Sequence, residues 1–378
     1  MKNPIGKLIA QTEGFKAFIP SKFPSKELFQ VSPVLIKKAN EATLKLGKLD
    51  GITKLLPDLD FFLFMYIRKD AASSSQIEGT RATMINAIEA ESKTSDKLPK
   101  DVDDILHYIE ALNYGMKRLG ALPMSNRFIC EVHKELMQGA RASHYCDPGN
   151  FRSSQNWIGG TTPANAKFVP PPVAAMKEAL SDLEKFFHSE DLFLPIIKAG
   201  LIHAQFETIH PFLDGNGRTG RILITLFLWI EGLLKKPVLF LSDYFKKHQQ
   251  IYYEKLRDYH NGDFESWLEF FLDGVIEVAD ESFLTIDAIT DIREKDMQKI
   301  QSLNKTSSES GILILQKLFT LPIVTVPKVM EWTGFTRRGA EKAIDRFVSL
   351  GILVLKDENE KYGRSFVYKR YLDVFEKY

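Results

Sequence analysis

The chain has 378 residues and an apolar share of 44%, which is ordinary for a soluble globular protein of two or three domains. A formal net charge of +1 argues against a protein that binds polyanions with its whole surface, although a local basic face is compatible with it. Two cysteines are too few for a disulfide framework. No secretory signal opens the sequence, and the longest apolar run, residues 222–230, is about half of a membrane span. We therefore expect a cytoplasmic protein with no membrane partner.

The N-terminal part predicts an irregular arm followed by helices. Residues 1–33 carry prolines and glycines with little periodicity, which indicates the arm. Residues 34–47 and 59–72 have helical patterns, and the second is strongly apolar at its start. In residues 73–80 (SSSQIEGT) three serines precede Glu78 by about one turn, which is typical of a capped helix start. Residues 91–100 are charged and contain proline, and we expect a linker there.

Two helices are predicted next. Apolar positions recur at helical spacing over residues 103–119, and Ser125 is placed to cap a helix over 127–137. His107 and His133 fall on these helices, and we expect them to be packed without a catalytic role.

Residues 147–172 break the helical periodicity. Gly159-Gly160 indicates a tight turn between short extended runs, and three consecutive prolines end the segment. An ordinary surface hairpin is the simplest interpretation. An amphipathic helix over 173–187 follows, and then an apolar helix over 194–208.

The chemically densest stretch is residues 210–221, HPFLDGNGRTGR, between two apolar helical runs. A Gly-rich turn that opens a buried helix leaves backbone N–H groups unpaired, which makes a cradle for an anion. Arg218 and Arg221 lie three residues apart, so both guanidinium groups can face one phosphate-containing ligand. Asp214 offers the hard oxygen that Mg²⁺ needs, and His210 can be neutral near pH 7 and accept a proton.

A metal-hydrolase alternative rests on three of the same residues. His203, Glu207 and His210 fall at i, i+4 and i+7, on one face of a helix, with ligand chemistry that suits a transition metal. Pro211 and the glycines end that helix at His210, and two arginines adjoin the site, which disfavours this alternative.

HPFLDGNGRTGR resembles the Fic motif, His-Pro-Phe-x-(Asp/Glu)-Gly-Asn-Gly-Arg-x-x-Arg, without a departure at any specified position. The resemblance implies a protein adenylyltransferase, which moves AMP from ATP to a Ser, Thr or Tyr hydroxyl of a target protein. It implies that His210 is the general base and Asp214 the Mg²⁺ ligand. It assigns the remaining motif residues to ATP: Gly215, Asn216 and Gly217 to the α- and β-phosphates, Arg218 and Arg221 to the β- and γ-phosphates, and Thr219 and Gly220 to the same site.

Two earlier segments acquire a second interpretation from this resemblance. Ser74-x-x-x-Glu78-Gly79 is similar to the inhibitory motif of Fic proteins, which implies that Glu78 pairs with Arg221 and takes it from the γ-phosphate. The hairpin becomes the flap, whose edge would pair with the target from Ile158 to Ala166. Arg152 matches an arginine that family members share before the flap.

The resemblance also implies an aromatic residue at the adenine pocket, beyond the motif. We expect Tyr253, with Tyr252 as the alternative and Asn261 as a candidate for the base edge. The helix that carries them is predicted to begin at Ser242. Helices over 263–276 and 277–302 are expected to follow.

The C-terminal part changes pattern at residue 307. Helices over 312–320, 327–333 and from Thr336 to Leu350 precede a strand and a charged hairpin, which resembles a winged helix-turn-helix domain. Basic side chains of the third helix are candidates for DNA phosphates, but acidic residues dilute that face, so DNA and a protein partner stay equal alternatives. These candidates are Arg337, Arg338, Lys342 and Arg346, beside Glu341 and Asp345.

The sequence therefore predicts a mainly α protein: a Fic-type helical bundle with a small β-hairpin flap and a C-terminal winged helix-turn-helix. We divide it into residues 1–95 with the inhibitory helix, the catalytic core 96–300 and the winged helix 301–378. A protein adenylyltransferase that uses ATP and Mg²⁺ is the leading hypothesis, with self-modification included. A nucleotide-sensing DNA-binding regulator, AMP removal and another phosphate-group transfer are the alternatives. The oligomeric state stays open, with a homodimer among the candidates.

Overall fold

The computed structural model describes residues 5–25, 29–53, 59–92, 98–139, 147–190, 193–357 and 363–377. Two compact units form the chain. The first comprises Met1–Asp50, Ser73–Thr80 and Asp103–Ala279, and the second Gly51–Ala72, Arg81–Val102 and Asp280–Tyr378. None of the helices in the described ranges combines the length and apolarity that crossing a bilayer requires. The three-part division of the sequence stays a prediction, and part of the expected linker, residues 93–97, lies outside the described residues.

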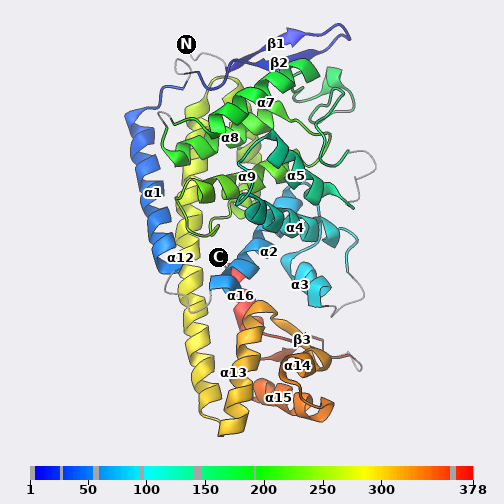
Figure 1. Cartoon of the computed structure of the whole chain (residues 1–378), viewed down its shortest axis with the longest axis vertical. Helices are drawn as coiled ribbons and strands as arrows, with labels where there is room; N and C mark the ends of the chain where they lie inside the picture. The colour runs from blue at the N-terminus through cyan, green and yellow to red at the C-terminus, as the bar shows by residue number, and fades with distance from the viewer. Residues whose placement is uncertain are drawn as a thin grey trace. The chain divides into compact units, whose positions relative to one another are not determined.

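The first unit is a helical bundle built around two consecutive helices, α8 and α9 (Figure 1). Residues 196–206 of α8 are all buried, as expected for a helix that is apolar on every side. Gly200 lets α12 approach, because a Cβ there would lie 2.8 Å from Leu268. The elements of this unit are β1 Gly6–Ala10, β2 Lys16–Pro20, α1 Pro33–Thr53, α4 Val102–Arg118, α5 Asn126–Met137, η1 Pro163–Asn165, α7 Val173–Phe187, α8 Pro195–Ile209, α9 Asn216–Ile230, α10 Ser242–Lys247, α11 Gln249–His260 and the first part of α12 Phe264–Gln301.

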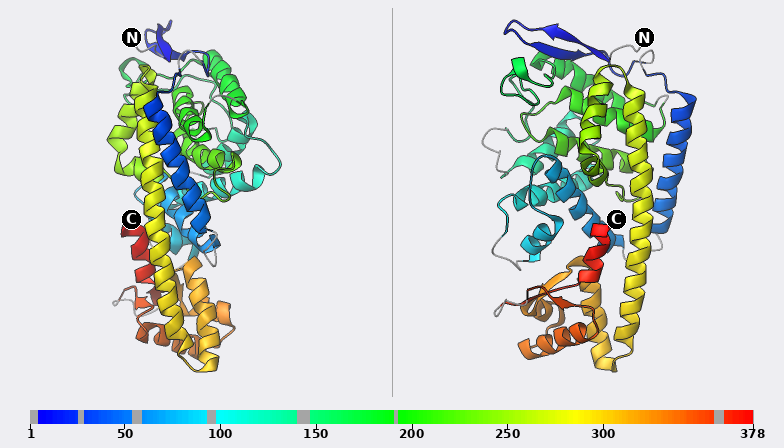
Figure 2. Two further views of the ribbon diagram at one scale, coloured as in Figure 1. Left: turned by 90° about the vertical axis from the view of Figure 1, so that its left-hand side faces the viewer. Right: turned by 180° about the vertical axis from the view of Figure 1, so that it is seen from behind.

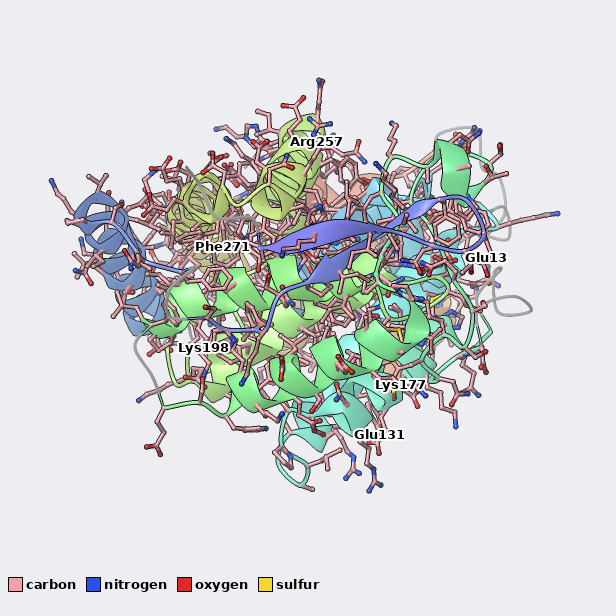
Figure 3. All side chains as sticks on the ribbon, turned by 90° about the horizontal axis from the view of Figure 1, so that it is seen from above. Glu13, Glu131, Lys177, Lys198, Arg257 and Phe271 are labelled. Atoms are coloured by element: carbon pink, nitrogen blue, oxygen red, sulfur yellow. The ribbon has the colours of Figure 1, made fainter. Side chains whose placement is uncertain are left out.

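The prediction of an irregular N-terminal arm is wrong for residues 6–20, which form an antiparallel hairpin. Gly6 pairs with Pro20 and Ala10 with Lys16, and the turn between them contains Gly14 at φ +83°. Figure 3 looks onto this hairpin, with Glu13 labelled in its turn. Four consecutive residues of β1 are exposed, so the strand shows no alternation of apolar and polar positions from which it could have been predicted.

Helix boundaries around the C-terminal part of the first unit also differ from expectation. The helix predicted from Ser242 is divided into α10 and α11 at His248, whereas the two helices predicted over 263–302 are the single helix α12. Gly274 does not end α12, since its role is close packing: a Cβ there would lie 2.6 Å from the Tyr244 ring. The start of α1 lies beside the first part of α12, and Lys38 forms a 2.7 Å ion pair with Asp273 (Figure 2).

The second unit combines helices with a three-stranded antiparallel sheet of order β3-β5-β4. The three helices and the hairpin occur in the order that the winged-helix prediction requires, and Thr336 caps α15 as expected by accepting from the Gly339 N–H. Strand β3 and helix α16 were not predicted, and the hairpin tip, residues 358–362, lies outside the described residues. This unit contains the first part of α2 Leu59–Ile77, α3 Met84–Ser92, the later part of α12, α13 Lys305–Thr320, β3 Ile323–Thr325, α14 Val326–Thr333, α15 Arg337–Ser349, β4 Val354–Leu355, β5 Ser365–Val367 and α16 Lys369–Lys377.

Candidate active site

The predicted motif forms the loop between α8 and α9 and the first turn of α9. His210 ends α8 in the left-handed conformation at φ +47°, and Gly215 begins α9 at φ +77°. Asn216 turns its side chain inward: its amide donates to the Phe212 carbonyl at 2.9 Å and its oxygen accepts from the Phe212 N–H at 2.8 Å. Thr219 likewise donates its hydroxyl to the Gly215 carbonyl at 2.8 Å. These two side chains fasten the loop. A contribution of Asn216 to a ligand would therefore come from its backbone N–H, whereas the Thr219 N–H already donates to the Gly215 carbonyl at 3.0 Å.

Side chains from distant segments hold the same loop from outside. Arg152 is buried, and its Nε donates to the His210 carbonyl at 3.0 Å. Asn156 donates to the Phe212 carbonyl at 2.8 Å. Burial lowers the pKa of Arg152 to about 10, so the side chain stays charged at neutral pH. Arg152 and Asn156 therefore satisfy the carbonyls of His210 and Phe212, the second of which also accepts from Asn216.

His133 is the loop support that sequence reasoning missed. Its ring stacks on Phe212 with centroids 3.6 Å apart, its Nδ1 accepts from the Gly149 N–H at 3.0 Å, and its Nε2–H donates to the Asp214 carbonyl at 2.9 Å. Burial lowers the pKa of His133 to about 4, so the ring is neutral with its proton on Nε2. His133 is packed on α5, as expected, and its packing partner is the motif loop.

His210 and Glu207 are both neutral near pH 7. The His210 side chain is 18% exposed, and its Nδ1 lies 3.8 Å from an oxygen of Glu207. Burial lowers the pKa of His210 to about 4, and burial raises the pKa of Glu207 to about 8. A neutral imidazole with an exposed edge can accept a proton from a hydroxyl.

The metal-hydrolase alternative is wrong for this structure. His203 is fully buried, and its Nε2 lies 2.8 Å from the Tyr252 hydroxyl, inside the aromatic core of the first unit. His210 has left the helical geometry that would have aligned it with the other two residues. Within the part of the chain that the structure describes, no group of three His, Cys, Asp or Glu side chains is placed to hold a metal ion.

The two arginines of the motif meet different acidic partners. Arg221 donates to the Ser74 hydroxyl at 2.8 Å, to the Ser74 carbonyl at 3.0 Å and to Glu78 at 2.7 Å. Arg218 is also buried, and its NH1 lies 3.9 Å from Asp104. Its Nε has no hydrogen-bond partner among the described residues, which leaves a buried donor for a ligand.

Glu78 occupies the place where the sequence predicts the anion cradle. Its carboxylate lies over the first turn of α9, so close that a Cβ on Gly217 would collide with it. The same added Cβ would lie 3.0 Å from NH1 of Arg221. Gly217 therefore allows a negatively charged group to reach the helix N-terminus and Arg221 together.

The segment that carries Glu78 is fixed at several points. Thr80 donates its hydroxyl to Asp104 at 3.0 Å, Gln249 donates to the Ile77 carbonyl at 3.0 Å, and Ser73 donates to Asp243 at 3.0 Å. The expected helix start at the serines is wrong, because residues 73–77 are the last residues of α2. The serine side chains are buried and bond to other elements rather than to the N–H groups of a first turn.

Tyr253 and Tyr252 have opposite environments. The Tyr253 side chain is 48% exposed, whereas Tyr252 is buried and bonded to His203. Asn261 lies at the exposed C-cap of α11. Of these two rings, that of Tyr253 is accessible and that of Tyr252 is not, and a role of Tyr253 at adenine stays a prediction.

The predicted flap is shorter and less regular than a hairpin with a turn at Gly159-Gly160. Ile158 and Phe168 form an isolated antiparallel pair, and the connection contains η1. Asn165 stabilises it by accepting from the N–H groups of Thr161 and Thr162 at 3.0 and 2.9 Å. Trp157 and Ile158 are each 38% exposed at the open side.

Comparison with known proteins gives a consistent family. Residues 36–117 match the Fic/DOC family N-terminal region and residues 123–228 match the Fic/DOC family. A relative named protein adenylyltransferase Fic from Aedes aegypti is 31% identical over 176 residues, which is 44% of this chain and 32% of the relative. A relative of the same name from Drosophila grimshawi is 28% identical over 246 residues, which is 63% of this chain and 46% of the relative. The chain thus spans about a third to a half of the length of these curated relatives.

Solved structures agree on the fold. A Fic family protein from Desulfovibrio desulfuricans G20 has a TM-score of 0.59 at 18% identity, covering 90% of this chain and 97% of that one. A fragment of Fic-1 from C. elegans has a TM-score of 0.51 at 17% identity, covering 68% of this chain and 74% of that one. This chain, with its helical bundle and unbroken HPFLDGNGRTGR loop, contains a Fic/DOC N-terminal region over residues 36–117 and a Fic domain over residues 123–228.

Proposed function

We propose that this chain is a protein adenylyltransferase that transfers AMP from ATP to hydroxyl groups of a target protein, and of itself, and that Glu78 restrains it. The observation that carries the proposal is the placement of a carboxylate, Glu78, between Arg221 and the first turn of α9. A site that holds a carboxylate in this way has the chemistry to hold a phosphate. The names of the curated relatives support adenylyl transfer as the reaction.

In the proposed reaction, the target hydroxyl oxygen forms a bond to the α-phosphorus while the bond from that phosphorus to the bridging oxygen breaks. His210 takes the hydroxyl proton, and pyrophosphate leaves with the electron pair of the broken bond. Arg218 and Arg221 bind the β- and γ-phosphates, and Tyr253 packs on adenine. Positioning and electrostatic stabilisation supply most of the catalysis in such a transfer.

The residues present fit a phosphate-bound Mg²⁺. One oxygen of Asp214 accepts from the Gly215 N–H at 2.6 Å, so the carboxylate is fixed beside the start of α9. A single carboxylate suits Mg²⁺, which takes its remaining ligands from substrate phosphates and water. When bound, the ion would neutralise charge on the phosphates.

The target is proposed to lie along the flap. Trp157 and Ile158 are exposed there. The backbone groups of Ile158 are paired with Phe168, so an extended segment would pair with those of its neighbours, Trp157 and Gly159, which point to the other edge of the strand. Residues 158–166 would place the accepting hydroxyl over His210 without demanding a particular sequence. This mode suits an enzyme whose acceptor is a Ser, Thr or Tyr in an extended loop.

The test is incubation with ATP labelled at the α-phosphate, followed by mass analysis of the labelled residue. We expect label on the chain or on added protein, more from Glu78→Gly than from the unaltered chain. His210→Ala should abolish labelling while ATP binding by calorimetry stays within about threefold. Equal loss of labelling and ATP binding in His210→Ala would make His210 structural and contradict the proposed base.

A second proposed activity concerns α15. Arg337, Arg338 and Lys342 are exposed along this helix, whose cap and following strand match the winged-helix expectation. A DNA fragment is the proposed partner, bound through its phosphates. Arg337 forms a 3.0 Å ion pair with Glu341, which reduces its attraction for phosphates. The double variant Arg338→Ala with Lys342→Ala therefore removes more of the positive charge that could bind DNA. A salt-dependent gel shift lost in that variant supports DNA binding, and an unchanged or absent shift refutes it.

A further inference from the structure

His260, the last residue of α11, joins three separate segments of the first unit. Its ring stacks on Phe168 of the flap with centroids 4.2 Å apart and an interplanar angle of 12°. Phe18 of β2 packs on the same imidazole at 5.1 Å. On the third side, Nε2 of His260 lies 3.0 Å from the Thr208 hydroxyl of α8.

The bond to Thr208 has a defined direction. The Thr208 hydroxyl hydrogen is donated to the Ala204 carbonyl at 2.7 Å, so its oxygen accepts from Nε2–H of His260. Burial lowers the pKa of His260 to about 3, which keeps the ring neutral. Thr208 precedes His210 by two residues, so the ring connects the flap to the end of the helix that presents His210.

The N-terminal hairpin closes the back of the flap. Ile158 and Phe168 exchange hydrogen bonds on one side of the returning strand, at 2.8 and 3.2 Å. The next carbonyl, that of Val169, points to the other side and accepts from the Phe18 N–H at 2.9 Å. Phe15, Ala17 and Val169 form a small buried cluster beneath this contact. The returning strand of the flap is thereby paired on both of its sides, with Ile158 on one and Phe18 on the other.

We propose that His260 is a positioning residue that, together with the β1–β2 hairpin, sets the distance between the flap and His210. This inference rests on the proposed function, because its consequence is the alignment of a target hydroxyl with the base. A peptide that pairs with the flap takes its position from the flap. A displacement of about 1 Å between the reacting atoms can lower a rate about 100-fold.

Three variants in the Glu78→Gly background separate the two contacts of the ring. His260→Phe keeps a ring against Phe168 but removes the hydrogen bond to Thr208. His260→Gln keeps an N–H donor but removes the stacking. Thr208→Val removes the acceptor with little change of shape, so it should lower labelling as much as His260→Phe does, and the double variant His260→Phe with Thr208→Val should add nothing further.

The readouts are self-labelling from α-labelled ATP, ATP affinity by calorimetry and amide hydrogen exchange at residues 158 and 168. We expect His260→Phe to lower labelling about tenfold and to speed exchange at the flap about tenfold, with ATP affinity unchanged within about twofold. A purely structural role would instead weaken ATP binding together with labelling. That outcome, or labelling and exchange within about twofold of the parent, overturns the inference.

Failure of the proposed function is distinguishable from failure of this inference. If the Glu78→Gly parent incorporates no label on itself or on added protein, adenylyl transfer is wrong. Hydrogen exchange still reports on the flap in that case, since it needs no turnover. Unchanged exchange in both His260 variants would then show that the ring does not position the flap.

Discussion

The Glu78 carboxylate accepts a 2.7 Å hydrogen bond from Arg221 and lies against the Cα of Gly217 at the start of α9. The Arg221 side chain is 2% exposed and that of Glu78 is 37% exposed, so the pair joins a fixed buried cation to a carboxylate at the surface. A phosphate and this carboxylate would compete for the same guanidinium and the same helix N-terminus. Hydrogen bonds of Thr80, Ile77 and Ser73 hold the segment on both sides of Glu78, so we expect a phosphate to displace the Glu78 side chain rather than the segment.

Replacing Glu78 by Gly should raise self-labelling from α-labelled ATP by about tenfold or more, because Arg221 becomes free to orient the terminal phosphate. Ser74→Ala is the matched comparison: it removes the hydrogen bond from Nε of Arg221 but leaves the carboxylate in place. It should stay near the unaltered rate. Equal initial rates for the unaltered chain and Glu78→Gly would remove Glu78 from any inhibitory role.

The pH dependence of labelling should reflect the neutral state of His210. Its pKa is lowered to about 4 by burial, so the imidazole is unprotonated throughout pH 6–8. In the Glu78→Gly background we therefore expect a rate that is nearly flat over pH 6–8 and falls only as the pH approaches 4. Initial rates in buffers of constant ionic strength measure this. A tenfold rise in rate between pH 6 and pH 7 would mean that the essential base has an ordinary histidine pKa.

Local pattern predicted the motif loop and the helical nature of the first unit, but not the break at His248 or the continuity of α12, because only the first two are encoded by neighbouring residues. α7 was predicted at its exact bounds, and Ser125 caps α5 by accepting from the Phe128 N–H. The supports of the loop could not be predicted, since His133 and Asn156 meet it only through tertiary packing. The β1–β2 hairpin was missed for a related reason: it is held by Val169 and Phe168, far along the chain, rather than by an alternating pattern of its own.

Replacing His133 by Phe should loosen the motif loop without leaving a cavity where the imidazole lies. The ring can still stack on Phe212, but the Asp214 carbonyl and the Gly149 N–H lose their partner. Leaving a buried polar group unpaired costs roughly 1–3 kcal/mol, so for these two groups we expect a loss of about 2–6 kcal/mol in the free energy of unfolding, together with weaker ATP binding. Urea unfolding and calorimetry measure the two effects. His107→Phe on the neighbouring helix α4 is the control, and an equal effect on ATP binding would argue against a role of His133 at the loop.

Because of Glu207, we expect the free energy of unfolding to depend on pH between about 4.5 and 8. Burial raises its pKa to about 8 from an ordinary value of 4.5, so the folded state binds the proton more tightly than the unfolded state. The resulting stabilisation is complete below pH 4.5 and is lost as the pH rises to about 8. The change is at most about 1.4 kcal/mol per pH unit, and on the order of a few kcal/mol in all.

Glu207→Gln removes this titration while it keeps the shape and polarity of the side chain. Urea unfolding at pH 5, 6, 7 and 8 should show that the free energy of unfolding of the variant rises relative to that of the unaltered chain at each step. Above pH 8 the difference should not grow further. The difference between the two proteins isolates Glu207 from the buried histidines, whose pKa values are lowered and which act in the opposite direction below pH 6.5. Glu13→Gln, in the exposed turn of the β1–β2 hairpin, is the surface control. Parallel stability curves for Glu207→Gln and the unaltered chain would mean that Glu207 is ionised in the folded protein, with Arg221 as its compensating charge.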